Sequence, residues 1–70
     1  MNKNELRGRI IAKGYNTEEF CKRIGMTRVT FDRRMNGKSE FTRDEIERIT
    51  TALDMSVNDM YSIFFAKFVA

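Results

Sequence analysis

The chain has 70 residues, with 13 lysines and arginines against 10 aspartates and glutamates, which gives a net charge of +3. This length allows one domain, residues 1–70, with a small core, and 41% hydrophobic residues suffice for a globular fold. The single cysteine, Cys21, excludes an internal disulfide, and the lack of histidine removes the commonest metal ligand and general base. We therefore expect no metal, no cofactor and no enzymatic activity.

The N-terminal residues are polar and do not resemble a signal peptide. The longest apolar run, 63–66, is far shorter than the roughly 20 residues that a membrane span requires. Together with the lone cysteine, these features predict a cytoplasmic protein without membrane association. No small-molecule ligand is evident.

Five short helices are predicted, and each follows a residue whose side chain can cap it. These capping residues are Asn2, Asn16, Thr27, Thr42 and Ser56. The first helix is predicted from about 3 to 13, with Leu6, Ile10 and Ile11 on its apolar side. Gly14 supplies the left-handed residue that ends this helix.

The second helix has a capping-box pattern, with Asn16 followed three residues later by Glu19. Phe20 and Ile24 point inward, and Cys21 is a small core residue beside them. Only Gly25–Thr27 separate this helix from the third, which runs to about Met35, before Asn36 and Gly37.

A second capping box, Thr42 with Glu45, opens the fourth helix. The expected apolar side of this helix consists of Ile46, Ile49 and Leu53, and that of the fifth helix of Val57, Met60, Tyr61 and Phe64. Residues 65–70 fit an extended tail as well as a continued helix. With no strand signal elsewhere, we expect an all-α fold, a compact five-helix bundle.

Two short helices joined by a three-residue turn that contains glycine define a helix-turn-helix, here at about 16–36. The residues around this motif resemble the lambdoid repressor and Cro (XRE-like) family, in particular short phage- and prophage-encoded members from Gram-positive bacteria. The resemblance is carried by 16–21, the turn Gly25-Met26-Thr27, Asn36-Gly37-Lys38, 41–46, 52–56 and the Phe64-Phe65 tail. It implies a five-helix lambda repressor-like domain, double-stranded operator DNA as ligand, and a homodimer.

The recognition helix of that family corresponds to 28–35. By helical projection, four side chains share the face that would meet bases in the major groove. These are Arg28, Val29, Asp32 and Arg33. Arginine can bond guanine in bidentate fashion and valine can contact a thymine methyl group. Asp32 either accepts from cytosine or pairs with Arg28 four residues earlier, and the intrahelical pair is the favoured reading.

Contacts to the DNA backbone are expected from the flanks of the motif, where the family meets phosphate. The residues concerned are Thr17, Thr27, Asn36, Lys38 and Arg43. Several also have local explanations as helix-cap or turn residues. In the wider family, the position of Arg34 is usually apolar and that of Met35 polar, and here the two are exchanged. This exchange leaves Thr30 and Arg34 as further candidates for DNA contact.

Two questions stay open at the level of sequence. The apolar residues Phe65, Phe68 and Val69 either contribute to a homodimer that reads a palindromic operator or cover the domain's own core. The rival function is a protein-interaction module or antirepressor on the same fold, because fold does not fix function. Three arginines and one aspartate in the third helix favour a DNA-binding transcriptional regulator.

Overall fold

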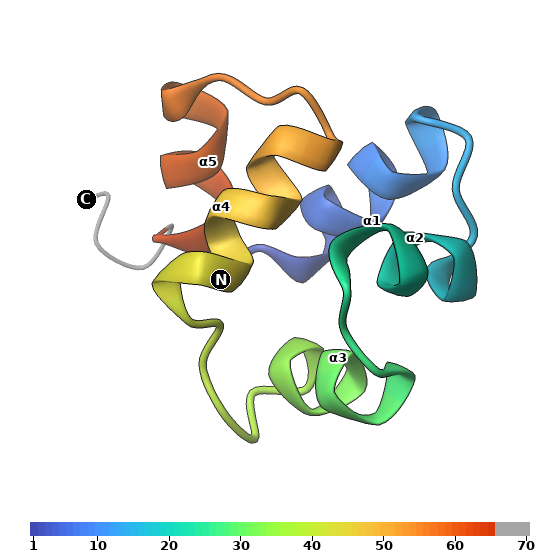
Figure 1. Ribbon diagram of the computed structural model, residues 1–70. Coiled ribbons are helices and arrows are strands. Elements are labelled where there is room, and N and C mark those ends of the chain that lie inside the picture. Colours follow the sequence, from blue (N-terminus) through green and yellow to red (C-terminus); the bar gives the residue numbers. More distant parts are fainter. Residues whose placement is uncertain (66–70) are drawn as a thin grey trace.

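The computed structural model describes residues 1–65, and these form five α-helices without strands. The helices are α1 (Lys3–Ala12), α2 (Thr17–Ile24), α3 (Arg28–Met35), α4 (Arg43–Ala52) and α5 (Val57–Phe64). Figure 1 shows α3 at one end of the molecule, with α4 and α5 on one side and α1 and α2 on the other. The predicted all-α fold is confirmed; Phe68 and Val69 lie outside the described residues.

The helices begin where the sequence predicts, because each of the five capping side chains accepts a hydrogen bond from a backbone amide of the first turn. At α2 the box is reciprocal. The Asn16 side chain accepts from the Glu19 amide at 2.8 Å, and the Glu19 carboxylate accepts from the Asn16 amide at 3.0 Å. Thr42 and Glu45 form the same box at α4.

Four of the helices are followed within two residues by a residue with positive φ, namely Gly14, Gly25, Gly37 and Asp54. At each of them, two backbone amides fold back onto carbonyl groups of the last turn. After α3, for example, the Lys38 amide bonds the Arg33 carbonyl at 2.9 Å and the Gly37 amide bonds the Arg34 carbonyl at 3.2 Å. This paired geometry satisfies carbonyl groups that a helix end would otherwise leave unbonded. Of these four residues, only Asp54 is not a glycine, and it adopts the left-handed conformation at φ 54°.

The core is built from side chains of all five helices and the turns between them. Its fully buried members of largest volume are Phe20, Leu6, Ile49 and Ile63. Five aromatic rings cross this core in a row of edge-to-face contacts, with centroids 5.5–6.1 Å apart. In order they are Tyr15, Phe20, Phe31, Phe41 and Phe64. The row joins the start of α2 to α3, the loop before α4, and α5.

Two predicted apolar faces were partly wrong. Ile11 is 71% exposed, because α1 covers the core only along the line from Leu6 to Ile10. On α5, Val57 and Tyr61 are exposed, and the buried pair is Ile63 and Phe64. The inward face of α5 is therefore rotated from the one that the sequence predicts. In so apolar a segment, the helical period does not identify a single buried side.

No helix within residues 1–65 has both the length and the apolar character needed to cross a membrane.

The substitution Gly25→Ala tests the turn between α2 and α3. Gly25 has φ +71°, and an added Cβ would lie 3.2 Å from Nη1 of Arg48. We expect the variant to lose about 1–2 kcal/mol of unfolding free energy, because an L-residue is strained in the left-handed region. The measurement is urea denaturation followed by circular dichroism.

Gly8→Ala is the matched control. Gly8 lies inside α1 and has no neighbour within 4 Å of the added Cβ. Alanine there should raise stability by about 0.5–1 kcal/mol, since glycine is unfavourable in a helix interior. Equal effects of the two substitutions would contradict the role given to Gly25.

Candidate nucleic-acid interface

The helix-turn-helix is formed by α2, α3 and the turn Gly25–Thr27 between them. Gly25 takes the left-handed conformation, Met26 turns into the core, and Thr27 caps α3. From α4, Arg48 donates a hydrogen bond of 2.8 Å to the Ile24 carbonyl, at the end of α2. The turn is thus supported from behind by α4, and α3 is presented at the outside of the molecule (Figure 1).

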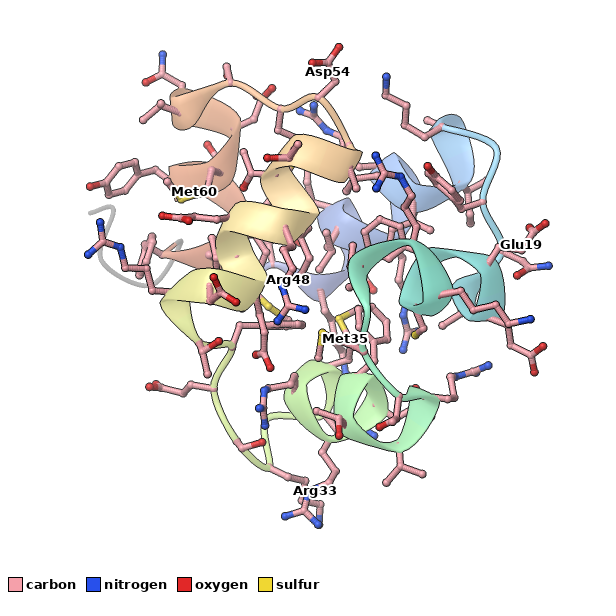
Figure 2. All side chains as sticks on the ribbon, in the orientation of Figure 1. Glu19, Arg33, Met35, Arg48, Asp54 and Met60 are labelled. Atoms are coloured by element: carbon pink, nitrogen blue, oxygen red, sulfur yellow. The ribbon has the colours of Figure 1, made fainter. Side chains whose placement is uncertain are left out.

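The outer face of α3 carries the four side chains predicted to read bases. Val29 is 71% exposed, although it is apolar. Arg33 points away from the body of the protein, at the opposite end from Asp54 (Figure 2). The Nε atom of Arg28 lies 3.2 Å from a carboxylate oxygen of Asp32, which confirms the predicted intrahelical pair. Phe31 and Met35 occupy the buried side of the same helix.

The residues predicted to contact the DNA backbone lie at helix ends or in the loop after α3. Thr17 is the first residue of α2, Asn36 follows the last residue of α3, and Lys38 is exposed in the loop beyond. Arg43 begins α4 with a highly exposed side chain, 3.6 Å from Glu47. The Thr27 hydroxyl caps α3 and also bonds the Thr30 hydroxyl at 2.9 Å.

Arg34 does not lie on the outer face of α3. Its Nε and Nη2 atoms donate to the two carboxylate oxygens of Glu45, at 2.8 and 3.1 Å, and its Nη1 donates to the Ser39 hydroxyl at 2.7 Å. The guanidinium is therefore directed toward α4, and its hydrogen bonds go to Glu45 and Ser39. The exchange of Arg34 and Met35 noted in the sequence thus places the methionine in the core and the arginine in an ion pair at its edge.

Sequence reasoning missed this role of Glu45, which it identified only as part of a helix cap. Within the described part of the chain, Glu45 is the only buried charged residue, with 7% of its surface exposed. Hydrogen bonds from Arg34 lower the pKa of Glu45, against the opposing effect of burial. The pKa of Arg34 is raised in turn by its hydrogen bonds to Glu45. The pair is therefore held in its charged form.

Two other features of the surroundings bear on chemistry. Burial raises the pKa of the Cys21 thiol, as fits a small core residue rather than a reactive one. Within residues 1–65, no cluster of acidic or sulfur side chains is arranged to hold a metal ion.

The sequence profile of the Cro/C1-type HTH DNA-binding domain matches residues 5–65, a range that includes α2 to α5 and most of α1. The chain belongs to this family. No curated protein and no solved structure gives a significant match. The predicted membership of the repressor and Cro type of helix-turn-helix proteins is thus confirmed, and the family's name identifies DNA as what such domains bind.

Replacing Glu45 by glutamine tests the ion pair of this Cro/C1-type domain. We expect Glu45→Gln to lose about 1.5–3 kcal/mol of unfolding free energy at pH 7, the range for hydrogen bonds to charged groups. Because the pKa of Glu45 is lowered in the folded state, its contribution is complete above the unfolded value near 4.5 and is lost as the pH falls through the folded value. The variant should show a flatter dependence of stability on pH in that acid range.

Glu47→Gln makes the same change of charge on the same helix and serves as the control. Glu47 is exposed, and its pair with Arg43 is long, at 3.6 Å. Exposed pairs of this kind contribute little, so stability at pH 7 should change by less than about 0.5 kcal/mol. Unfolding curves that coincide for the two variants from pH 3 to pH 7 would contradict the analysis.

Proposed function

We propose that this protein is a sequence-specific transcriptional regulator that binds double-stranded DNA with α3 in the major groove. The observation that carries the proposal is that α3 has one side packed against the protein and one side exposed. Phe31 and Met35 hold the helix to the body, whereas Val29 and Arg33 are exposed without a packing role on the described residues. On the exposed side of this helix, Val29 therefore offers an apolar contact and Arg33 offers hydrogen-bond donors to a partner surface.

The chemistry of the outer face matches base edges in the major groove. Arg33, which points away from the body of the protein in Figure 2, can donate two hydrogen bonds to a guanine. Val29 can pack against a thymine methyl group. The pair between Arg28 and Asp32 orients the Arg28 side chain across the helix surface, and Asp32 has free acceptor capacity for a cytosine amino group.

Contacts to phosphate come from the two flanks. On one side are Thr17, at the exposed amino end of α2, and Thr27 at the start of α3. On the other side are Asn36, Lys38 and Arg43, which lie in the loop after α3 or at its ends. These contacts would fix the orientation of the protein on the duplex and make its affinity dependent on salt. Thr30 remains a secondary candidate, whereas Arg34 is engaged by Glu45 and takes no part in this proposal.

A role as a phage or prophage repressor, or as a Cro-like protein, is supported by the resemblance of 41–46 and of the Phe64-Phe65 tail to short phage-encoded members of the family.

A homodimer on a palindromic operator forms the second part of the proposal. On α5, Val57 and Tyr61 are 65% and 55% exposed, and the Tyr61 ring lies 5.3 Å from that of Phe65. These three residues follow one another at intervals of four and extend toward Phe68 and Val69 in the sequence. A two-fold pair would place two copies of α3 about 34 Å apart, one turn of DNA.

The test is selection of binding sites from a random-sequence duplex library at two salt concentrations. We expect wild-type protein to enrich a short palindrome whose binding weakens with salt. Arg33→Ala should relax the preference at one position of each half-site, with a loss of about 1–3 kcal/mol for the preferred base. Lys13→Ala is the control, because it removes the same single positive charge at a distant place. Lys13 pairs with Asp54 at the end of the molecule opposite α3.

Two outcomes would count against this function. If folded wild-type protein enriches nothing at low salt, the outer face of α3 serves a protein partner instead. If Arg33→Ala keeps the sequence preference of wild type, as Lys13→Ala should, Arg33 does not read a base.

Sedimentation equilibrium tests the dimer. We expect dimers at tens of micromolar protein, and Tyr61→Lys should raise the dissociation constant at least tenfold because it places a charge in the apolar contact. Ser62→Lys, on a neighbouring exposed position of α5, is the control and should have little effect. A wild-type protein that sediments as a monomer at high micromolar concentration would contradict this part of the proposal.

A further inference from the structure

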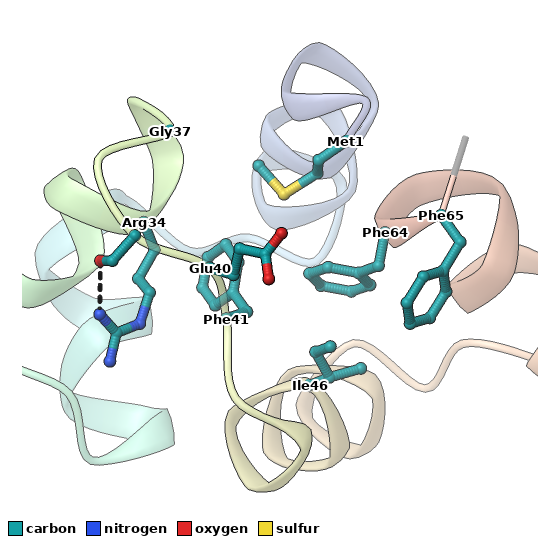
Figure 3. Close-up of a pocket in the computed structure, with 9 residues that line it drawn as sticks. Met1, Arg34, Gly37, Glu40, Phe41, Ile46, Phe64 and Phe65 are labelled. Atoms are coloured by element: carbon teal, nitrogen blue, oxygen red, sulfur yellow. Dashed lines mark hydrogen bonds between the residues drawn. The ribbon is translucent and has the colours of Figure 1, made fainter. Parts of the chain in front are cut away.

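Three residues from different parts of the chain meet at the inner edge of α3: Arg34 of α3, Ser39 of the following loop, and Glu45 of α4. We refer to them as the Arg34 clamp. Arg34 uses three of its nitrogen atoms here, at distances of 2.7–3.1 Å from oxygen acceptors. Figure 3 shows the Arg34 side chain beside Phe41 and Glu40, with its hydrogen bond to Ser39 marked. The side chains of Arg34 and Glu45 are only 18% and 9% exposed.

The two buried side chains of α3 are both apolar. Phe31 and Met35 are the buried residues of this helix. Burial of apolar surface has no preferred direction, so it favours the attachment of the helix more than one rotation about its axis. A bidentate pair between guanidinium and carboxylate does have a fixed geometry. The clamp therefore adds a strongly directional constraint to the apolar contacts of α3.

Glu45 is itself held in place, which makes it a firm anchor. One of its carboxylate oxygens also accepts the Thr42 amide at 2.9 Å, and its own amide bonds the Thr42 hydroxyl. Ser39 adds a point in the middle of the loop, between the end of α3 and the start of α4. The clamp thus links both α3 and this loop to the start of α4.

We propose that the Arg34 clamp sets the rotation of α3 about its own axis, and so determines which side chains of its outer face meet the bases. Arg34 and Glu45 act as positioning residues and do not themselves contact DNA. Arg33 immediately precedes Arg34 in the chain, so a change in the rotation of α3 displaces its side chain directly. The inference rests on the proposed function of α3. It predicts that the clamp contributes to sequence discrimination rather than to general affinity for DNA.

The test is the double variant Arg34→Met with Glu45→Gln, which leaves the net charge unchanged. Glutamine retains an oxygen that can accept the Thr42 amide, so the capping box of α4 is preserved. A buried ion pair replaced as a whole often costs little stability, in contrast to the loss of one partner. The quantity measured is the affinity for the enriched operator divided by the affinity for a scrambled duplex of equal length.

We expect the double variant to lower this ratio at least tenfold while its affinity for the scrambled duplex stays within twofold of wild type. The matched control is Arg9→Met with Asp59→Asn, which removes a pair of 3.1 Å between α1 and α5 by the same charge changes. This control should leave the ratio unchanged. Arg34→Lys, which keeps the charge but not the fork, provides a second variant should the double variant fail to fold.

The outcomes separate the inference from the function on which it rests. A folded double variant, or a folded Arg34→Lys variant, with the ratio of wild type would overturn the inference and leave the function standing. An equal fall in both affinities would also overturn it, because the clamp would then serve stability alone. Wild-type protein without preference for any duplex would overturn the proposed function first and the inference with it.

Discussion

The attachment of α3 through only two buried side chains, Phe31 and Met35, is the constraint on which the rest of the structure depends. Phe31 stands in the middle of the aromatic row, with Phe20 of α2 on one side and Phe41 of the following loop on the other. Edge-to-face contacts of this kind add to the burial of the rings themselves. Because the row continues to Phe64 of α5, the helix that faces outward is linked to the far side of the core.

The charged side chains of α3 complement its attachment through two apolar residues. With so few buried apolar residues, α3 leaves most of its surface to arginine and other polar groups. Arg28 is paired within the helix and Arg34 is paired with α4, whereas Arg33 extends outward. One helix of eight residues thus contains three arginines in three different environments.

The sequence predicted those features that depend on neighbours within one turn. The five caps, the two capping boxes and the pair between Arg28 and Asp32 are all separated by three or four residues, so their geometry follows from the helix alone. The inward face of α5 was predicted only in part: Phe64 is buried and Met60 packs against the core, but Val57 and Tyr61 are exposed, because a segment rich in apolar residues offers more than one plausible side. The pair of Arg34 and Glu45 was not predicted at all. Eleven residues and a loop separate them, and the capping box already explained the glutamate.

The way in which the ends of α3 are built has a consequence for the evolution of this protein. Its start is defined by Thr27 and its end by the backbone hydrogen bonds around Gly37, so neither end depends on the outward side chains. Val29 and Arg33 are absent from the core. These positions can therefore be exchanged for residues of other shape and charge while the scaffold is retained. Under the proposed function, a domain of this design can acquire a new target by a few substitutions, each selected on recognition without a concurrent demand on folding.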